Sequence, residues 1–144
     1  MTAGVWSPIA AILLALLPTA TFAQLSREAF VGSWRGTSVC TNRQAAPACT
    51  DEQVIYDISA PAGTPDVLVV KADRIANGQR EPMGEVTFHP DPASARWVSE
   101  ISTPRVHAVW HLSIKDGGLT GGMFLIPSRT AIRTIELRKV QGSE

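Results

Sequence analysis

The sequence lacks an excess of charge of either sign. Its 13 Lys and Arg residues are matched by 13 Asp and Glu residues, so the formal net charge at pH 7 is zero. A neutral chain creates no net field that would attract nucleic acid or an anionic membrane surface. We therefore expect neither nucleic acid nor a membrane among its partners.

The sequence also has few of the residues that build catalytic and metal sites. It contains only two cysteines and three histidines, and it has no zinc, phosphate-binding or nucleophile-elbow motif. His107 and His111 are four residues apart, which on a strand is about 13 Å and too far to share a metal ion. Asp51 and Glu52 are adjacent, so on a strand they would point to opposite faces. We expect no metal, no cofactor and no enzymatic activity.

No charged residue precedes Arg27. An uncharged apolar run over residues 9–17 is too short to span a bilayer as a helix. Small residues follow at Thr21 and Ala23, the two positions that a signal peptidase reads. We interpret residues 1–23 as a secretory signal peptide, and expect a periplasmic or secreted protein without a membrane span.

The remaining residues, 24–144, have the length of one domain. Gly, Pro, Asn and Asp recur every ten or so residues between segments rich in β-branched and aromatic residues, which predicts an all-β fold. A short helical turn is expected at 26–31. The expected strands cover residues 33–41, 52–59, 66–75, 83–89, 95–102, 105–115, 118–126 and 130–140. An eight-stranded up-and-down antiparallel barrel would leave no free edge, and a sandwich is the alternative.

Asp116-Gly117 is typical of a type I′ hairpin turn, in which both central residues take positive φ. This turn places Trp110 opposite Met123 on a face where every residue is apolar or glycine. Asn77-Gly78 indicates a second hairpin of the same type.

The second hairpin places Val69 opposite Val86 on the inward face. On that register Lys71 and Asp73 also point into the barrel. Pro82 weakens the assignment, because proline cannot donate to a strand ladder.

Arg133 also falls on the inward face, and a buried charge must be paired or bound. One interpretation is a cavity in which Lys71, Asp73 and Arg133 recognise a ligand with a polar or anionic group, Arg133 acting as a forked donor. The other is a structural ion-pair cluster. The aromatic residues expected to line the interior are Tyr56, Trp97 and Trp110. Such residues more often form a core than a ligand site.

Cys40 lies at the end of the first expected strand, and Cys49 lies just before the second. In an exported chain this pair is expected to form a disulfide that holds the intervening loop.

On the outer face, His107, Val109, Phe124 and Ile126 form a strip that is either a partner surface or covered by another segment of the chain.

Residues 32–40 read Gly-x-Trp-x-Gly-x-Ser-x-Cys. The Gly-x-Trp start resembles the first strand of lipocalin-like (calycin) barrels, and the longer pattern is similar to small exported bacterial proteins. The resemblance implies structural roles for Gly32 and for Trp34, which would close the narrow end of the barrel. It also implies an arginine across Trp34, for which Arg138 is better placed than Arg133. The alternation of the last strand instead points Arg138 outward unless a bulge intervenes.

The function that these expectations favour is an exported lipocalin-like protein that binds a small hydrophobic or amphipathic molecule. An eight-stranded barrel holds little more than its own side chains, so the cavity should be small. The alternative is a protein-interaction module, such as a periplasmic inhibitor or assembly partner, that acts through its loops or outer strand face.

Overall fold

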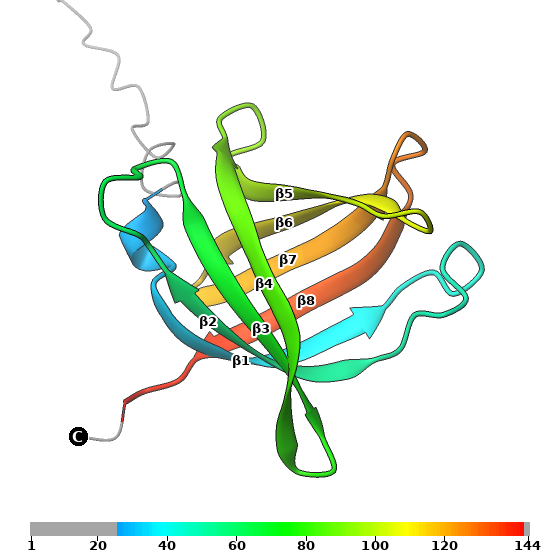
Figure 1. Ribbon diagram of the computed structural model, residues 1–144, viewed down its shortest axis with the longest axis horizontal. Coiled ribbons are helices and arrows are strands. Elements are labelled where there is room, and N and C mark those ends of the chain that lie inside the picture. Colours follow the sequence, from blue (N-terminus) through cyan, green and yellow to red (C-terminus); the bar gives the residue numbers. More distant parts are fainter. Residues whose placement is uncertain (1–25, 143–144) are drawn as a thin grey trace, which may run out of the picture.

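The computed structural model describes residues 26–142, which form one closed antiparallel barrel (Figure 1). A 3-10 turn, η2 (Arg27–Ala29), precedes the barrel. The strands are β1 (Gly32–Cys40), β2 (Glu52–Ser59), β3 (Leu68–Ala76), β4 (Gln79–Asp91), β5 (Arg96–Ser102), β6 (His107–Lys115), β7 (Gly118–Leu125) and β8 (Ala131–Lys139). Each strand pairs with the next, and β8 pairs with β1. The predicted barrel is therefore confirmed, whereas the predicted signal peptide lies outside the described residues.

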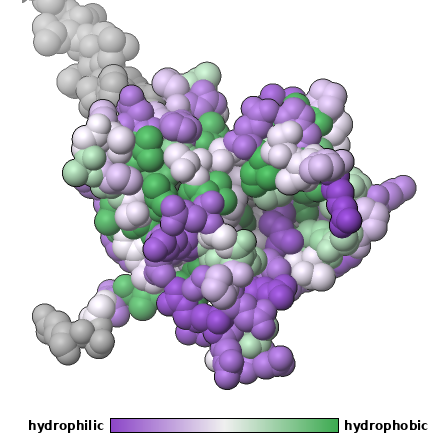
Figure 2. Space-filling model, viewed as in Figure 1, coloured by the Kyte–Doolittle hydropathy of each residue, from purple (hydrophilic) through white to green (hydrophobic). Residues whose placement is uncertain are grey.

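Strand β4 is the element whose bounds differ most from the expected ones, because it begins at Gln79 rather than near residue 83. Pro82 is tolerated there because β4 pairs with β5 only from His89 to Asp91, which leaves one edge of its first half without a partner strand. This half of β4 and the end of β3 form a hairpin that protrudes from the barrel (Figure 1). Hydrophilic side chains cover the protruding hairpin in the space-filling view (Figure 2).

The β6–β7 hairpin has the predicted register. Asp116 and Gly117 take φ angles of 51° and 74°, as a type I′ turn requires. Trp110 pairs with Met123, and Leu112 is fully buried. This hairpin supplies one wall of the core.

The β3–β4 hairpin departs from the predicted register. The pairing shifts between Ala72 and Asp73, because Ala72 faces Gly84 whereas Asp73 faces Pro82. Met83 is therefore an extra residue in β4, a β-bulge that shifts the register of everything beyond it.

As a result of the bulge, Val86 pairs with Val70 rather than with Val69. Val70 is fully buried and Lys71 is exposed. The predicted interior placement of Lys71 and Asp73 is wrong, since both residues lie on the outer face of the barrel.

One end of the barrel is closed by η2 and the residues that follow it. Phe30 is fully buried and packs edge-to-face on Trp97, with 6.1 Å between ring centroids. The Trp34 indole donates a hydrogen bond of 2.7 Å to the Phe30 carbonyl. Arg27 ties the turn to the β2–β3 loop by donating to the Thr64 carbonyl at 2.7 Å. Trp34 thus lies at the closed end, as predicted.

The cation over Trp34 is not Arg138. Lys139 Nζ lies 5.5 Å from the Trp34 ring centroid, while Arg138 pairs with Arg35 and is exposed. No register shift interrupts the β1–β8 ladder, so the strand alternation that points Lys139 inward is preserved. The expected role of Arg138 is therefore wrong.

Residues 26–142 contain no helix with the length and apolar character needed to cross a membrane.

Candidate functional site

The end of the barrel opposite η2 is bordered by three loops, namely 41–51, 103–106 and 126–130 (Figure 1). The first of these carries the predicted disulfide, which joins Cys40 to Cys49. This disulfide fixes the loop to the end of β1. The mouth of the barrel is therefore covalently held on one side.

We expect the double variant Cys40→Ala and Cys49→Ala to unfold more readily than the wild-type protein. Closing a loop of about ten residues restricts the unfolded chain and stabilises the folded state by roughly 2.7 kcal/mol in the chain-entropy model. Urea denaturation of the two proteins measures this difference. A change below about 0.5 kcal/mol would mean that the loop is held by its other contacts.

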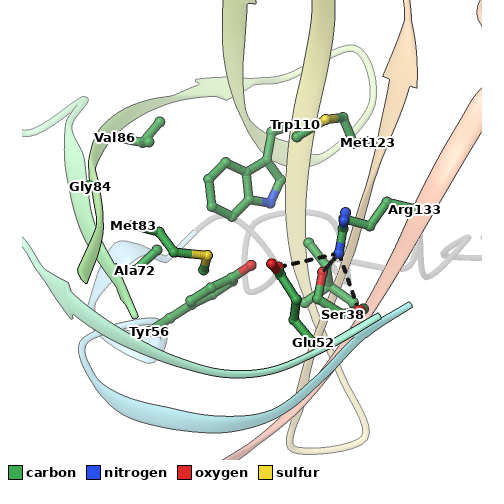
Figure 3. Close-up of a pocket in the computed structure, with 11 residues that line it drawn as sticks. Ser38, Glu52, Tyr56, Ala72, Met83, Gly84, Val86, Trp110, Met123 and Arg133 are labelled. Atoms are coloured by element: carbon green, nitrogen blue, oxygen red, sulfur yellow. Dashed lines mark hydrogen bonds and ion pairs between the residues drawn. The ribbon is translucent and has the colours of Figure 1, made fainter. Parts of the chain in front are cut away.

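A cavity of about 180 Å³ lies inside the barrel near this mouth (Figure 3). It is lined by Ser38, Glu52, Tyr56, Ala72, Met83, Gly84, Val86, Trp110, Met123, Arg133 and Ile135. Most of this lining is apolar, and the volume is below the roughly 300–1,000 Å³ of pockets that hold drug-sized ligands. The expectation of a small cavity is confirmed. Of the predicted lining residues, Tyr56, Trp110 and Arg133 are present, whereas Trp97 belongs to the closed end.

A wider depression of about 690 Å³ lies outside this cavity, between the disulfide loop and the ends of β6, β7 and β8. Its wall includes Ala46, Pro47 and Leu125, and it shares Met123 and Arg133 with the inner cavity. Arg133 therefore lies where the two compartments meet.

Arg133 of β8 is held by contacts with two other segments of the chain. Its Nη1 donates to the Ser38 carbonyl at 3.2 Å and to the Ser38 hydroxyl at 2.7 Å. Its Nη2 donates to the Thr50 carbonyl at 3.0 Å and approaches Cys49 Sγ at 3.1 Å. The side chain thus connects β8, β1 and the disulfide loop.

Glu52 is the counter-ion of Arg133, with 3.6 Å between Glu52 Oε2 and Arg133 Nη1 (Figure 3). This role was not predicted from the sequence, in which Glu52 stood out only as the neighbour of Asp51. Alternation along β2 could have found it, since Val54 and Tyr56 point inward and Glu52 shares their face.

Two further polar groups face the cavity. The Trp110 side chain is 7% exposed, and its Nε1 is buried without a hydrogen-bond partner among the described residues. Burial raises the pKa of the Tyr56 hydroxyl far above its usual range, so this group remains a protonated donor at physiological pH. The Tyr56 hydroxyl points toward Glu52 (Figure 3).

The arrangement suits reversible binding of an amphipathic molecule, because apolar walls surround a few polar groups. Within residues 26–142, no three His, Cys, Asp or Glu side chains gather closely enough to hold a metal ion.

Lys71 and Asp73 lie away from this site, on the outer face of β3. Asp73 and Asp57 both accept hydrogen bonds from Arg80, the Asp57 contact at 2.7 Å, and Lys71 is the cross-strand neighbour of Asp57. These residues form an exposed ion-pair network, in which each pair contributes little to stability.

The outer strip consists of Val109, Phe124 and Ile126, which line a shallow groove with His111. The strip is only half-buried, and the Arg129 guanidinium lies 5.1 Å from the Phe124 ring centroid. His107 instead contacts Glu100, with 2.6 Å between Nε2 and Oε1. Part of the expected partner surface is thus covered by the chain itself.

His111 gives the protein a pH dependence. Burial, with a smaller contribution from Arg96, lowers the pKa of His111 below its usual value. The imidazole of His111 therefore binds a proton more readily in the unfolded chain than in the folded one. The stabilisation that neutral His111 provides is present above about pH 6.5 and is lost as the pH falls. We expect His111→Gln to reduce the loss of stability between pH 7 and pH 5, measured by urea denaturation. An equal loss in the wild-type protein and in His111→Gln would show that His111 does not cause it.

No protein-family model matches the chain, and no curated protein matches it. Among solved structures, two single-residue mutants of the fluorescent protein UnaG are similar to it at 16% sequence identity. One aligns with a TM-score of 0.47 over 78% of this chain and 97% of its own, and the other with 0.44 over 80% and 99%. Similarity at this level does not establish a family. The chain is an eight-stranded β-barrel with a small cavity at its mouth, and membership of the lipocalin-like proteins stays a prediction.

Proposed function

We propose that the protein binds a small hydrophobic or amphipathic molecule in the barrel cavity. The observation that carries this proposal is the unpaired Trp110 Nε1 at the wall of an otherwise mostly apolar cavity. Buried donors in folded proteins almost always have a partner. Of the two indoles that lack one within residues 26–142, Trp97 and Trp110, that of Trp110 lines the cavity. A ligand with a hydrogen-bond acceptor would supply the missing one.

The same proposal includes export of the protein from the cytoplasm and a binding function rather than an enzymatic one. Export is supported by the leader-like sequence of residues 1–23, and a disulfide is consistent with an oxidising compartment. The absence of catalytic motifs from the sequence supports binding rather than catalysis.

The proposal is tested by native mass spectrometry on the protein purified from its own source, compared with an Ala72→Phe variant. Ala72 is buried and lines the cavity, so a larger side chain there fills the space. We expect the wild-type protein to carry a small organic molecule that the variant lacks. Val69→Phe, on the outer face of the same strand, is the matched control and should retain it.

The proposal fails if the wild-type protein retains nothing and also takes up none of a series of six- to ten-carbon acids, amides and alcohols. It also fails if Ala72→Phe, still folded by circular dichroism, binds as well as the wild-type protein.

A second candidate, a protein-interaction module, is favoured by the strip of Val109, Phe124 and Ile126 on the outer face. The groove that these residues line is accessible on a folded barrel. A stoichiometric protein partner whose binding is abolished by Phe124→Asp but not by Ala72→Phe would support this candidate over the first.

A further inference from the structure

The inner cavity contains charges of both signs in close contact. Among the residues that line it, Glu52 and Arg133 are the charged ones, and their side chains are 3.6 Å apart. Each is largely withdrawn from solvent, with side-chain exposures of 18% and 16%. The cavity therefore has no net charge, and a ligand ion of either sign would meet a like charge beside the opposite one.

Arg133 has few donors left for a ligand. A guanidinium group has five N–H donors, and the four on Nη1 and Nη2 face Ser38, Thr50 and the disulfide. A carboxylate is bound strongly by arginine when two parallel N–H groups are available. Only Nε remains, so the bidentate contact cannot form without breaking the contacts that hold the mouth.

The cations around the mouth are also paired with the chain's own carboxylates. Arg74 donates to Glu81 at 2.9 Å, and Arg43 donates to Asp51 at 3.0 Å. Arg105 lines the outer depression rather than the inner cavity, and it is exposed to solvent. The inner cavity thus offers an anion no unpaired positive charge.

The Tyr56 hydroxyl points toward Glu52 (Figure 3). Apart from this hydroxyl, the cavity presents one free donor and one carboxylate acceptor. In the described part of the chain, Trp110 Nε1 has no acceptor. The Glu52 carboxylate contacts Arg133 at 3.6 Å and Arg74 at 3.9 Å, both beyond hydrogen-bond distance. A ligand group that fits both must accept from the indole and donate to the carboxylate.

On the basis of the proposed function, we infer that the ligand carries at its buried end an uncharged group that both donates and accepts hydrogen bonds. A primary amide or an alcohol on a short apolar chain has this chemistry. A fatty-acid carboxylate lacks the donor and places a second negative charge beside Glu52.

The test compares octanamide with octanoate by isothermal titration calorimetry on the purified protein at pH 7. Leaving a buried polar group unpaired costs about 1–3 kcal/mol, so octanamide should bind about tenfold more tightly or better. Glu52→Gln removes the negative charge from the cavity and should bring the two affinities within about threefold. Glu136→Gln, on the exposed outer face of β8, is the matched control and should leave the preference unchanged.

Tighter binding of octanoate by the wild-type protein would overturn this inference while leaving the proposed function intact. An unchanged preference in a folded Glu52→Gln variant would also overturn it, because the carboxylate would not be the selecting group. Binding of neither compound, by a protein that also retains no molecule from its own source, would contradict the proposed function itself. The wild-type comparison decides the question even if Glu52→Gln does not fold.

Discussion

Arg133→Met is expected to lower the free energy of unfolding by about 3 kcal/mol. Removing one partner of a fully buried ion pair costs about 3–5 kcal/mol, and the Arg133 and Glu52 side chains retain 16% and 18% of their exposure. The substitution removes the Arg133 donors to Ser38 and to the Thr50 carbonyl, and leaves Glu52 without its nearer counter-ion. Because Ser38 is 2% exposed, water cannot readily replace the contacts that Ser38 loses. Urea denaturation at pH 7 measures the effect.

The matched control for this prediction is Arg138→Met on the same strand. Arg138 is exposed on the outer face, so its replacement should change stability by no more than about 0.5 kcal/mol. The double variant Arg133→Met and Glu52→Gln should lose less free energy of unfolding than the sum of the losses in the two single variants. This is because Glu52→Gln removes the negative charge that Arg133→Met leaves unpaired. Equal stability of Arg133→Met and Arg138→Met would show that Arg133 does not hold the mouth.

Gly36→Ala is expected to destabilise the barrel by about 3 kcal/mol or more, at or above the upper end of the usual cost of overpacking. A Cβ atom at this position would collide with the Glu136 carbonyl oxygen and stand 2.9 Å from the Leu137 Cα. Both are backbone atoms of β8, the strand that closes the barrel against β1. They can give way only if the closing ladder separates.

Gly118→Ala is the comparison for this second prediction. Its Cβ would lie 3.1 Å from Arg138 Nη1, the far end of a flexible side chain that can move aside. We expect a loss below about 1 kcal/mol, measured by the same thermal or urea denaturation. Similar losses for the two glycine variants would mean that β1 and β8 do not approach as closely as described.

The sequence predicts those parts of the fold where turn chemistry and strand alternation agree. At Asp116-Gly117 both indicate the same register, and the structure has it. At Asn77-Gly78 the turn is also as predicted, but the extra residue Met83 shifts the β3–β4 pairing by one residue. The residues of β3 that pair beyond the bulge therefore take the opposite faces from those predicted. The alternation of apolar and polar residues does not indicate a β-bulge here, and Pro82 is the only local sign of an irregularity. For this reason the sequence predicts Lys71 and Asp73 on the inner face of the barrel instead of the outer face.

Strand alternation predicts part of the candidate site. Alternation tells which face a side chain takes, and it correctly points Tyr56, Trp110 and Arg133 inward. It does not tell how far along the barrel axis a residue lies, because that depends on the stagger of the strands. Trp97 therefore shares the interior with Trp110 but packs against Phe30 at the closed end.

A ligand that enters the inner cavity should accept a hydrogen bond from Trp110 Nε1. The most direct measurement is the indole N–H resonance of Trp110 in a ¹H–¹⁵N spectrum during titration with octanamide, assigned by its loss in Trp110→Phe. Trp97 provides an internal control, because its Nε1 is also buried and unpaired but lies away from the cavity. We predict that the Trp110 resonance moves downfield and saturates while that of Trp97 stays in place. A Trp110 resonance that does not move, or that moves equally with Trp97, would show that no ligand pairs with the Trp110 indole in this cavity.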